Sequence, residues 1–285
     1  MRCKHILARL GAALSIVNII KIAAVLCCAA ALTSSFGLAA ESSFPAQTAL
    51  TTVFDYANFN SVEGLTVNGD ADTAVNNVGI RYLRITSAER FTGSSSVWYS
   101  DQVNVAQGFV THFKFRVRPL SSSWTTADGF AFVIQGSGPS ALGDAGGWLG
   151  YTGIADSLAV EFDTFTNPWD PNNNHVAIQS CGTAVNTTDH SACNLGIQPD
   201  LPFVIADNQG HECTIAYVPG TGGKAGTLRV GIDKQPILTI KVNLQTLLDL
   251  PGNEAWVGFT GGTGSAWEIG AIVKWSYSTL AAAAK

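Results

Sequence analysis

A strict two-residue alternation of side-chain character near residue 110 constrains the fold more than any other feature of the chain. Phe113, Phe115 and Val117 share one register, and Lys114 and Arg116 occupy the other. Side chains at every second position lie on the same face of a β-strand. This pattern is therefore typical of a strand with one face buried and one face in solvent.

Runs of the same kind recur along the chain, separated by clusters of Gly, Asn, Pro and Ser. We expect strands at 81–86, 109–117, 129–135, 158–165, 175–179, 214–218, 228–232, 237–242, 255–260 and 271–277. A helical period occurs only near residues 244–250. Many short strands without long helices predict an all-β protein, an antiparallel β-sandwich or jelly roll with one core.

The first 40 residues differ in composition from the rest. Arg2, Lys4 and Arg9 form a basic start, an unbroken apolar run follows at 22–32, and small residues end at Ala40. This order is typical of a secretory signal peptide, and the apolar run is too short to span a membrane. We therefore expect residues 1–40 to be removed, 41–50 to be a short N-terminal segment, and the protein to be secreted, periplasmic or extracellular, without membrane insertion.

Charge limits the partners of the remaining chain. The full chain has 16 basic and 21 acidic residues, and four of the basic ones and no acid lie in the first 40. The rest carries 12 basic residues against 21 acidic ones, a formal charge of −9. Such a body does not favour nucleic acid or an anionic membrane as a partner, but it is compatible with cations and neutral sugars.

Three cysteines lie outside the leading segment. Cys181 and Cys193 enclose a short polar loop and would form a disulfide in an oxidising compartment, although the sequence leaves other pairings open. Cys213 alternates with apolar residues, which indicates a buried, unreactive thiol. The loop also contains the glycosylation sequon Asn186-Thr187-Thr188.

The stretch from 158 to 178 carries the chemistry. Glu161, Asp163 and Phe165 are two apart on an expected strand and so should share a face. Two acids directed together from an apolar strand are costly unless a positive charge lies between them. Asp170 follows in a proline-containing loop, and His175 opens the next strand, which should return its ring to Glu161.

These donors divide into two cation sites. Oxygen donors from Asp163, Asn167, Asp170 and the backbone carbonyl of Phe165 suit Ca²⁺. A mixed set of Glu161, Asp163, Asp170 and His175 suits Mn²⁺ or a similar transition ion. Of the other histidines, we expect His112 on the surface and His190 and His211 in structural roles.

Five motifs in chain order resemble those of legume-type (L-type) lectins, over about residues 54–277. They are the opening strands at 54–59 and 65–70, the run 127–132, the glycine-rich loop 146–150, the 158–178 stretch, and the final strand pair from 256 to 277. The resemblance implies a concanavalin-like sandwich at 51–280, a tail at 281–285, and a bacterial-type secreted member that binds carbohydrate without catalysis. Its partners would be glycans or glycoconjugates, and a homo-oligomer would gain avidity, although the sequence leaves the oligomeric state open.

The resemblance also implies a shallow sugar site beside the two ions. Asp128, after a cis peptide to Ala127, would accept hydrogen bonds from two sugar hydroxyls, and the N–H of Gly147 would donate to them. Asn167 would give its oxygen to Ca²⁺ and its NH₂ to the sugar. The ring of Phe165 would cover the sugar's apolar face.

The loop before the last strand would form the other wall of the sugar site. The backbone contacts implied there come from Gly264, Ser265 and Ala266. After Glu268 this loop lacks the polar run that is usual in the family. The sequence therefore leaves open whether the site prefers galactose or mannose and glucose.

Two alternatives share the sandwich. A β-glucanase-type glycoside hydrolase also uses alternating acids on one strand, but its pattern resembles Glu-x-Asp-x-Glu, and position 165 is Phe. An adhesion module with degenerate sugar binding is the other, and the complete set of ligands at 161–175 argues against it.

Overall fold

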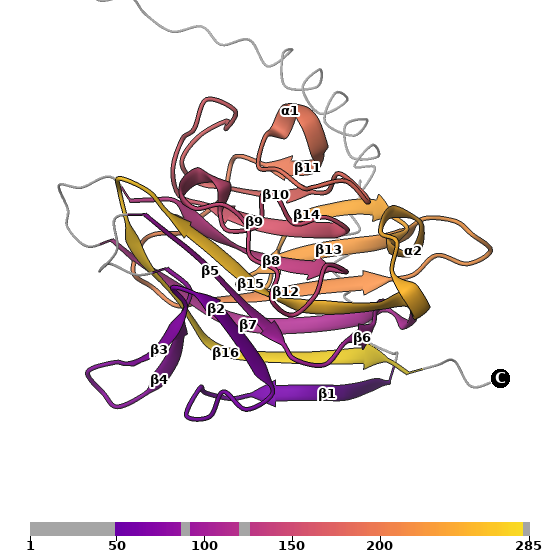
Figure 1. Cartoon of the computed structure of the whole chain (residues 1–285), viewed down its shortest axis with the longest axis horizontal. Helices are drawn as coiled ribbons and strands as arrows, with labels where there is room; N and C mark the ends of the chain where they lie inside the picture. Colours follow the sequence, from indigo (N-terminus) through magenta and orange to yellow (C-terminus); the bar gives the residue numbers. More distant parts are fainter. Residues whose placement is uncertain (1–48, 87–91, 120–125, 282–285) are drawn as a thin grey trace, which may run out of the picture. The chain divides into compact units, whose positions relative to one another are not determined.

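The computed structural model describes residues 49–86, 92–119 and 126–281, and Figure 1 shows that strands make up most of this part. The chain divides into the units Met1–Ser42 and Ser43–Lys285, and every described residue belongs to the second. The signal peptide expected at 1–40, most of the segment at 41–50 and most of the tail at 281–285 lie outside the described residues.

The first sheet has eight antiparallel strands in the order β14-β13-β12-β7-β16-β4-β3, with β1 paired to β16. Figure 1 shows β7 and β16 running side by side through its length. The bounds of its strands are β1 Leu50–Tyr56, β3 Asp72–Val75, β4 Arg81–Arg84, β7 Phe109–Pro119, β12 His211–Val218, β13 Gly226–Ile232, β14 Gln235–Val242 and β16 Glu268–Leu280.

The second sheet also has eight strands, in the order β11-β10-β9-β8-β15-β5-β2, with β6 paired to β15. Its bounds are β2 Leu65–Gly69, β5 Gly93–Tyr99, β6 Val103–Asn104, β8 Gly129–Gln135, β9 Ser157–Asp163, β10 His175–Gln179, β11 Asn194–Gln198 and β15 Glu254–Thr263. Helical segments are short: α1 His190–Cys193, α2 Leu244–Leu247, and 3₁₀ turns η2 Val105–Gln107, η3 Gly146–Trp148 and η4 Pro251–Asn253. The expected antiparallel sandwich is confirmed.

The main core lies between the two sheets. Phe113, Phe115 and Val117 are fully buried, while Arg116 on the other register is exposed, so the alternation in β7 is confirmed. Phe130 of β8 and Phe162 of β9 stack with ring centroids 4.6 Å apart. Aromatic side chains from both sheets therefore fix how the layers pack.

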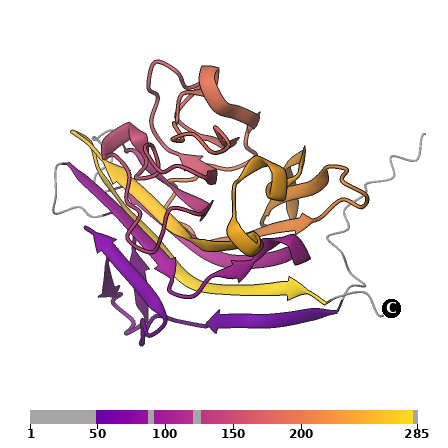
Figure 2. The same ribbon diagram turned by 45° about the vertical axis from the view of Figure 1, so that its right-hand side comes forward.

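Strands β8 and β9 are buried on both faces, which explains their nearly continuous apolar sequence. A second cluster covers their outer face, where Leu149, Tyr151 and Ile154 from the loop before β9 pack against Ala131 and Ala159. In Figure 2 the loops around β9 and β10 rise above this sheet. Glu161 has the same strand parity as Ala159, so it lies under this cover.

The cysteine predictions are confirmed. Cys181 and Cys193 form a disulfide, and Cys213 is a free, buried thiol whose pKa burial raises well above its usual value. The asparagine of the sequon, Asn186, lies inside the folded chain. Its side chain is 1% exposed and its amide donates to Ser157 and to the carbonyl of Gln179, so a glycan would break these bonds.

The described residues contain no helix with the length and apolar character needed to cross a bilayer.

Candidate functional site

Strand register brings the predicted metal ligands together. In the β9–β10 pair, Asp163 lies opposite His175 and Glu161 lies opposite Ala177. Strand β9 ends at Asp163, two residues earlier than expected, so Phe165 lies in the following loop and is half-buried rather than on the strand face. The expectation that the His175 ring returns to Glu161 is confirmed, with Nε2 3.6 Å from Oε1.

The Glu161 side chain is enclosed, with 1% of its surface exposed. Its Oε2 accepts a hydrogen bond of 2.6 Å from the hydroxyl of Tyr151. Its Oε1 is buried and has no hydrogen-bond partner among the described residues. A buried carboxylate oxygen without a donor is costly, so this atom indicates a place for a cation.

The loop after β9 folds back on itself and positions the oxygen donors. The Asn167 N–H donates to Oδ2 of Asp170 at 2.7 Å, and the Phe165 N–H donates to Oδ1 of Asp163 at 2.8 Å. The other oxygen of Asp170 is buried and without a partner. Asp163, Asp170 and His175 place ligand atoms within 4.8 Å of one another.

The acids around this loop raise the pKa of Asp163. Burial raises the pKa of Asp163 well above its usual value, and the charges of Asp170 and Glu161 raise it further. A divalent cation between these oxygens would reverse the effect, because it stabilises the ionised form. The residues therefore fit the metal pair that the sequence implies.

His190, expected in a structural role, lies within the acid cluster around Glu161. Glu161, His175 and His190 form a second group with ligand atoms within 4.8 Å of one another. His190 Nε2 lies 3.2 Å from Glu161 Oε1 and 3.3 Å from Asp170 Oδ1. Burial lowers the pKa of His190, but the surrounding carboxylates outweigh this and raise it overall. Sequence reasoning missed this residue because its acidic neighbours come from 20 to 29 positions earlier in the chain.

His211, expected in a structural role, has an acidic partner at each ring nitrogen. Its Nδ1 lies 2.6 Å from Asp233 and its Nε2 3.2 Å from Asp207. Asp233 comes from the turn between β13 and β14, which only the pairing of the strands brings near. His112, as expected, is exposed.

Asp128 lies at the start of β8, next to the metal loop. The peptide between Ala127 and Asp128 is cis, as the resemblance implied. The carbonyl of Asp128 accepts a hydrogen bond of 3.1 Å from the N–H of Thr164, and its Oδ2 is buried without a partner. Burial raises the pKa of Asp128 to about 7, with the N–H of Gly264 acting in the opposite direction and the charge of Asp170 adding to the rise.

Gly147 packs directly against Asn167. A Cβ on Gly147 would lie 2.5 Å from Nδ2 of Asn167, so no other residue fits without displacing that amide. The same Nδ2 atom is buried and donates to no described residue. Within the described residues, the Nδ2 of Asn167 is therefore a donor without an acceptor, and the Oδ2 of Asp128 is an acceptor without a donor. The short loop 146–147 adjoins both side chains.

The loop between β15 and β16 lies next to Asp128. A Cβ on Gly264 would lie 3.2 Å from Oδ2 of Asp128, so these two residues adjoin. Ala266 accepts a hydrogen bond from the N–H of Gly264, and Ser265 between them is exposed. The structure brings Asp128, Gly147, Asn167 and Gly264 together, and it places Phe165, Ser265 and Ala266 on the adjoining loops.

Glu268 is a buried acid that sequence reasoning did not select. It is fully buried at the start of β16, and its Oε2 accepts a hydrogen bond of 2.8 Å from Thr164. Burial raises the pKa of Glu268 to about 8, and the charge of Asp128 adds to the rise. Its hydrogen bond with Thr164, the residue after Asp163, connects the end of the 264–267 loop to the end of β9. The signal for it was an acid between apolar residues at the start of a strand.

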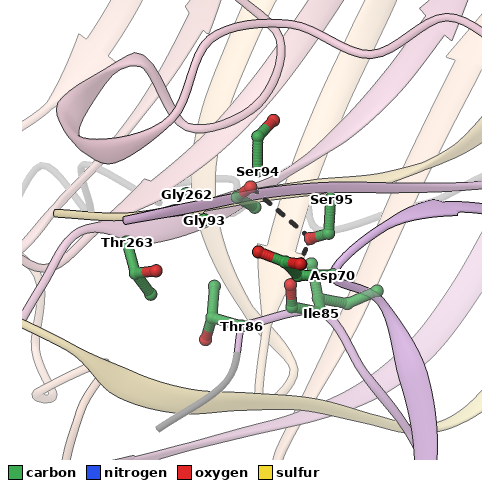
Figure 3. Close-up of a pocket in the computed structure, with 9 residues that line it drawn as sticks. Asp70, Ile85, Thr86, Gly93, Ser94, Ser95, Gly262 and Thr263 are labelled. Atoms are coloured by element: carbon green, nitrogen blue, oxygen red, sulfur yellow. Dashed lines mark hydrogen bonds between the residues drawn. The ribbon is translucent and has the colours of Figure 1, made fainter. Parts of the chain in front are cut away.

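Two hollows lie in other parts of the described surface. Figure 3 shows a small one of about 10 Å³ between Asp70, Thr86, Ser95 and Thr263, with room for about one water molecule. A larger groove of about 440 Å³ lies on the outer face of the first sheet, beside Arg116 and Arg118.

The whole domain matches a known family. Residues 51–285 match the legume lectin domain, and the chain belongs to this family. The solved structure of the lectin from Bauhinia forficata in complex with GalNAc superimposes with a TM-score of 0.63 and 25% identity, covering 82% of this chain and 99% of that one. Peanut lectin gives the same TM-score at 23% identity and supports the fold.

Sequence relatives extend the comparison. The putative bark agglutinin LECRPA3 of Robinia pseudoacacia is 28% identical, with 81% of this chain and 82% of that protein covered. The probable L-type lectin-domain containing receptor kinase S.7 of Arabidopsis thaliana is also 28% identical, but the chain spans about a third (34%) of its length. These relatives are plant proteins and give no support to a bacterial-type member.

Proposed function

We propose that this protein is a lectin that binds glycans at the surface formed by Asp128, Gly147, Asn167 and Gly264, beside a structural pair of Ca²⁺ and a transition ion. The polar atoms of Asp128 and Asn167 carry this proposal. One is a buried acceptor without a donor, and the other is a buried donor without an acceptor. Adjacent hydroxyls of a sugar can satisfy both atoms, since each hydroxyl both donates and accepts.

Two neighbours complete the polar frame. The backbone of Gly264 adjoins the Asp128 carboxylate, and Gly147, which has no side chain, lets the Asn167 amide lie against its backbone. Phe165 is half-buried on the same loop and offers a ring to the apolar face of a sugar. Ser265 and Ala266 would add backbone contacts from the opposite loop. The kind of monosaccharide stays open.

The ligand named for one relative agrees with this class of ligand. The solved Bauhinia forficata structure contains GalNAc.

The metal pair would have a structural role. Asp163, Asn167, Asp170 and the carbonyl of Phe165 would hold Ca²⁺, while Glu161, Asp163, Asp170 and His175 would hold Mn²⁺ or a similar ion. When bound, the ions would neutralise the crowded acids and keep the Asn167–Asp170 turn in place. That turn carries the amide that faces the sugar.

Binding without catalysis agrees better with the geometry than hydrolysis. A retaining hydrolase needs two carboxyl groups that reach the substrate. Glu161 is fully buried and bonded to Tyr151, and Asp163 is 1% exposed. Neither acid can contact a polysaccharide without opening the loop.

We further propose that the protein is exported. The disulfide in the described part is typical of an oxidising compartment. The basic and apolar order of residues 1–40 is typical of a signal peptide.

A glycan array tests the proposal. The full chain, loaded with Ca²⁺ and Mn²⁺, should bind a related group of glycans, lose binding in EDTA and recover it when both ions return. Binding that EDTA leaves unchanged would contradict the metal role, and no binding on a broad array would favour an adhesion module with degenerate sugar binding. Release of new reducing ends from β-glucans, stopped by Glu161→Gln, would favour the hydrolase.

A further inference from the structure

Two histidine rings face each other at the transition-metal half of the proposed site. Nε2 of His175 lies 3.2 Å from Nε2 of His190, and Oε1 of Glu161 lies 3.6 Å from the first and 3.2 Å from the second. His175 is fully buried and His190 is 9% exposed. Sequence analysis predicted a metal role for His175 and a structural role for His190.

The hydrogen-bond partners of the His175 ring direct its Nε2 toward His190 and Glu161. Nδ1 of His175 lies 3.0 Å from the carbonyl of Asn172, and in the tautomer that donates to this carbonyl Nε2 keeps a lone pair. That lone pair faces Nε2 of His190 and a carboxylate oxygen of Glu161 that accepts no hydrogen bond. Three electron-rich atoms that converge in a buried space favour a cation between them.

The distances suit one ion with two imidazole ligands. Nitrogen ligands lie about 2.1 Å from Zn²⁺. Two such nitrogens 3.2 Å apart subtend about 100° at the ion, which is close to the angle of a tetrahedral site. Oε1 of Glu161 and Oδ1 of Asp170, both buried and without partners, supply oxygens on the same side.

The second nitrogen of His190 is also supported. Its Nδ1 lies 2.7 Å from the side-chain amide of Gln179, whose oxygen is buried and has no partner. With this amide turned so that its oxygen accepts from Nδ1–H, Nε2 of His190 keeps a lone pair for a metal. A partner on the far nitrogen of this kind typically orients metal-binding histidines.

Local structure holds His190 in place. It begins α1, where the Asp189 side chain accepts a hydrogen bond from the Ser191 N–H, and α1 ends at Cys193. The Cys181–Cys193 disulfide ties this turn to the chain just after β10. The ring is therefore directed at Glu161 by a short, covalently closed loop.

We propose that His190 is a second imidazole ligand of the transition-metal site, and that the site therefore selects a late first-row cation such as Zn²⁺ over Mn²⁺ more strongly than one histidine would allow. The proposal rests on the metal pair of the proposed function and adds a ligand and a preference to it. Carboxylates suit Mn²⁺, whereas imidazole favours later ions.

Competitive titration tests the preference. Metal-free full-length protein is titrated with Zn²⁺ and with Mn²⁺ in the presence of Ca²⁺, and bound metal is counted by elemental analysis. His190→Ala should lower the affinity for Zn²⁺ at least about tenfold and that for Mn²⁺ less than about threefold. The matched control is His112→Ala, which removes an exposed histidine and should change neither. Equal losses for both ions in His190→Ala would overturn the proposal.

Pulsed EPR of the Cu²⁺-loaded protein counts the imidazole ligands directly. The wild type should give two coupled imidazoles, and His190→Ala and His190→Gln should each give one. A single imidazole in the wild type would overturn the proposal, and this result does not depend on whether a variant folds.

Glycan binding is measured on the same samples, so the two proposals fail separately. Two imidazoles without glycan binding would leave the His190 ligand standing and contradict the proposed function. Glycan binding with a single coupled imidazole would contradict the His190 ligand and leave the proposed function standing.

Discussion

Two histidine–carboxylate clusters lie in different sheets of this protein, and their chemistry differs. At His211, both ring nitrogens face carboxylates, Asp233 at 2.6 Å and Asp207 at 3.2 Å, and these acids are 42% and 32% exposed. The ring lies between Phe115 and Phe203, with centroids 5.3 and 4.7 Å away. Every polar atom of that imidazole therefore has a partner.

The cluster around Glu161 is the opposite. Two imidazole nitrogens face each other, the acids are almost fully buried, and one oxygen each of Glu161 and Asp170 has no partner. Proximity of histidine and acid does not by itself distinguish a metal site from a structural ion pair. Buried polar atoms that lack hydrogen-bond partners and converge on one point favour a metal site, because burying them is costly unless a cation binds there.

The largest expected effect comes from removing an acid that both ions would share. Asp163→Ala should lower the affinity for Ca²⁺ and the transition ion by about 100-fold or more and abolish glycan binding. Calorimetry with each ion and the glycan array measure these effects. The matched control is Asp207→Ala in the His211 cluster, which should retain both activities. Retained metal binding in Asp163→Ala would contradict the ligand assignment.

A smaller and more selective effect is expected at the sugar surface. Asp128→Asn removes a charged acceptor but keeps the shape, so glycan affinity should fall about 10- to 100-fold, which corresponds to a charged hydrogen bond. Metal stoichiometry should not change, because Asp128 is not among the proposed ligands. Glycan binding equal to that of the wild type would show that the sugar site lies elsewhere.

Of the two clusters, only the one around Glu161 lies beside a disulfide, Cys181–Cys193. Replacing Cys181 and Cys193 together by Ser opens a 12-residue separation and should lower the free energy of unfolding by about 3 kcal/mol. Urea unfolding at neutral pH measures this loss. The double variant should also bind Zn²⁺ more weakly, because the turn that carries His190 loses its anchor. The matched control is Cys213→Ser, in which the disulfide remains intact and Zn²⁺ affinity should be unchanged.

The smallest effect is expected in the satisfied cluster. Although burial acts to raise the pKa of Asp233, its hydrogen bonds from His211 and from the Glu212 N–H lower it overall. A lowered pKa means that the ionised form stabilises the fold above the usual pKa of about 3.9, and that this contribution is lost as pH falls through the lower folded value.

Asp233→Asn should therefore cost less than about 1 kcal/mol of unfolding free energy at pH 6, because the side chain is partly exposed. The difference from the wild type should disappear near pH 2. Urea unfolding at both pH values measures it. A difference that persists at pH 2 would show that the charge of Asp233 is not its cause.

Much of the fold was predictable because strand alternation is local. The expected ranges 129–135 and 175–179 agree with β8 and β10 residue for residue. The strand expected to end at Phe165 stops at Asp163, because the Asp163 side chain accepts a hydrogen bond from the Phe165 N–H and starts the loop. Side-chain to backbone bonds of this kind compete with strand pairing and are hard to foresee.

The candidate site was predictable only where its residues are close in sequence. Glu161, Asp163, Asp170 and His175 fall within 15 consecutive positions, and strand geometry alone brings them together. His190 and Glu268 were missed because they lie far from these residues in sequence. The disulfide loop brings His190 to the site, and the start of β16 brings Glu268 there.

The sequence alone determined that this chain forms an antiparallel sandwich and carries a compact set of metal donors, because both depend on two-residue periodicity and short spacing. Only the tertiary structure decided which histidine lies against the buried acids around Glu161 and which is satisfied by partly exposed acids. His190 and His211 both lie near acids, but only packing determines whether those acids are buried without donors or bonded at the surface.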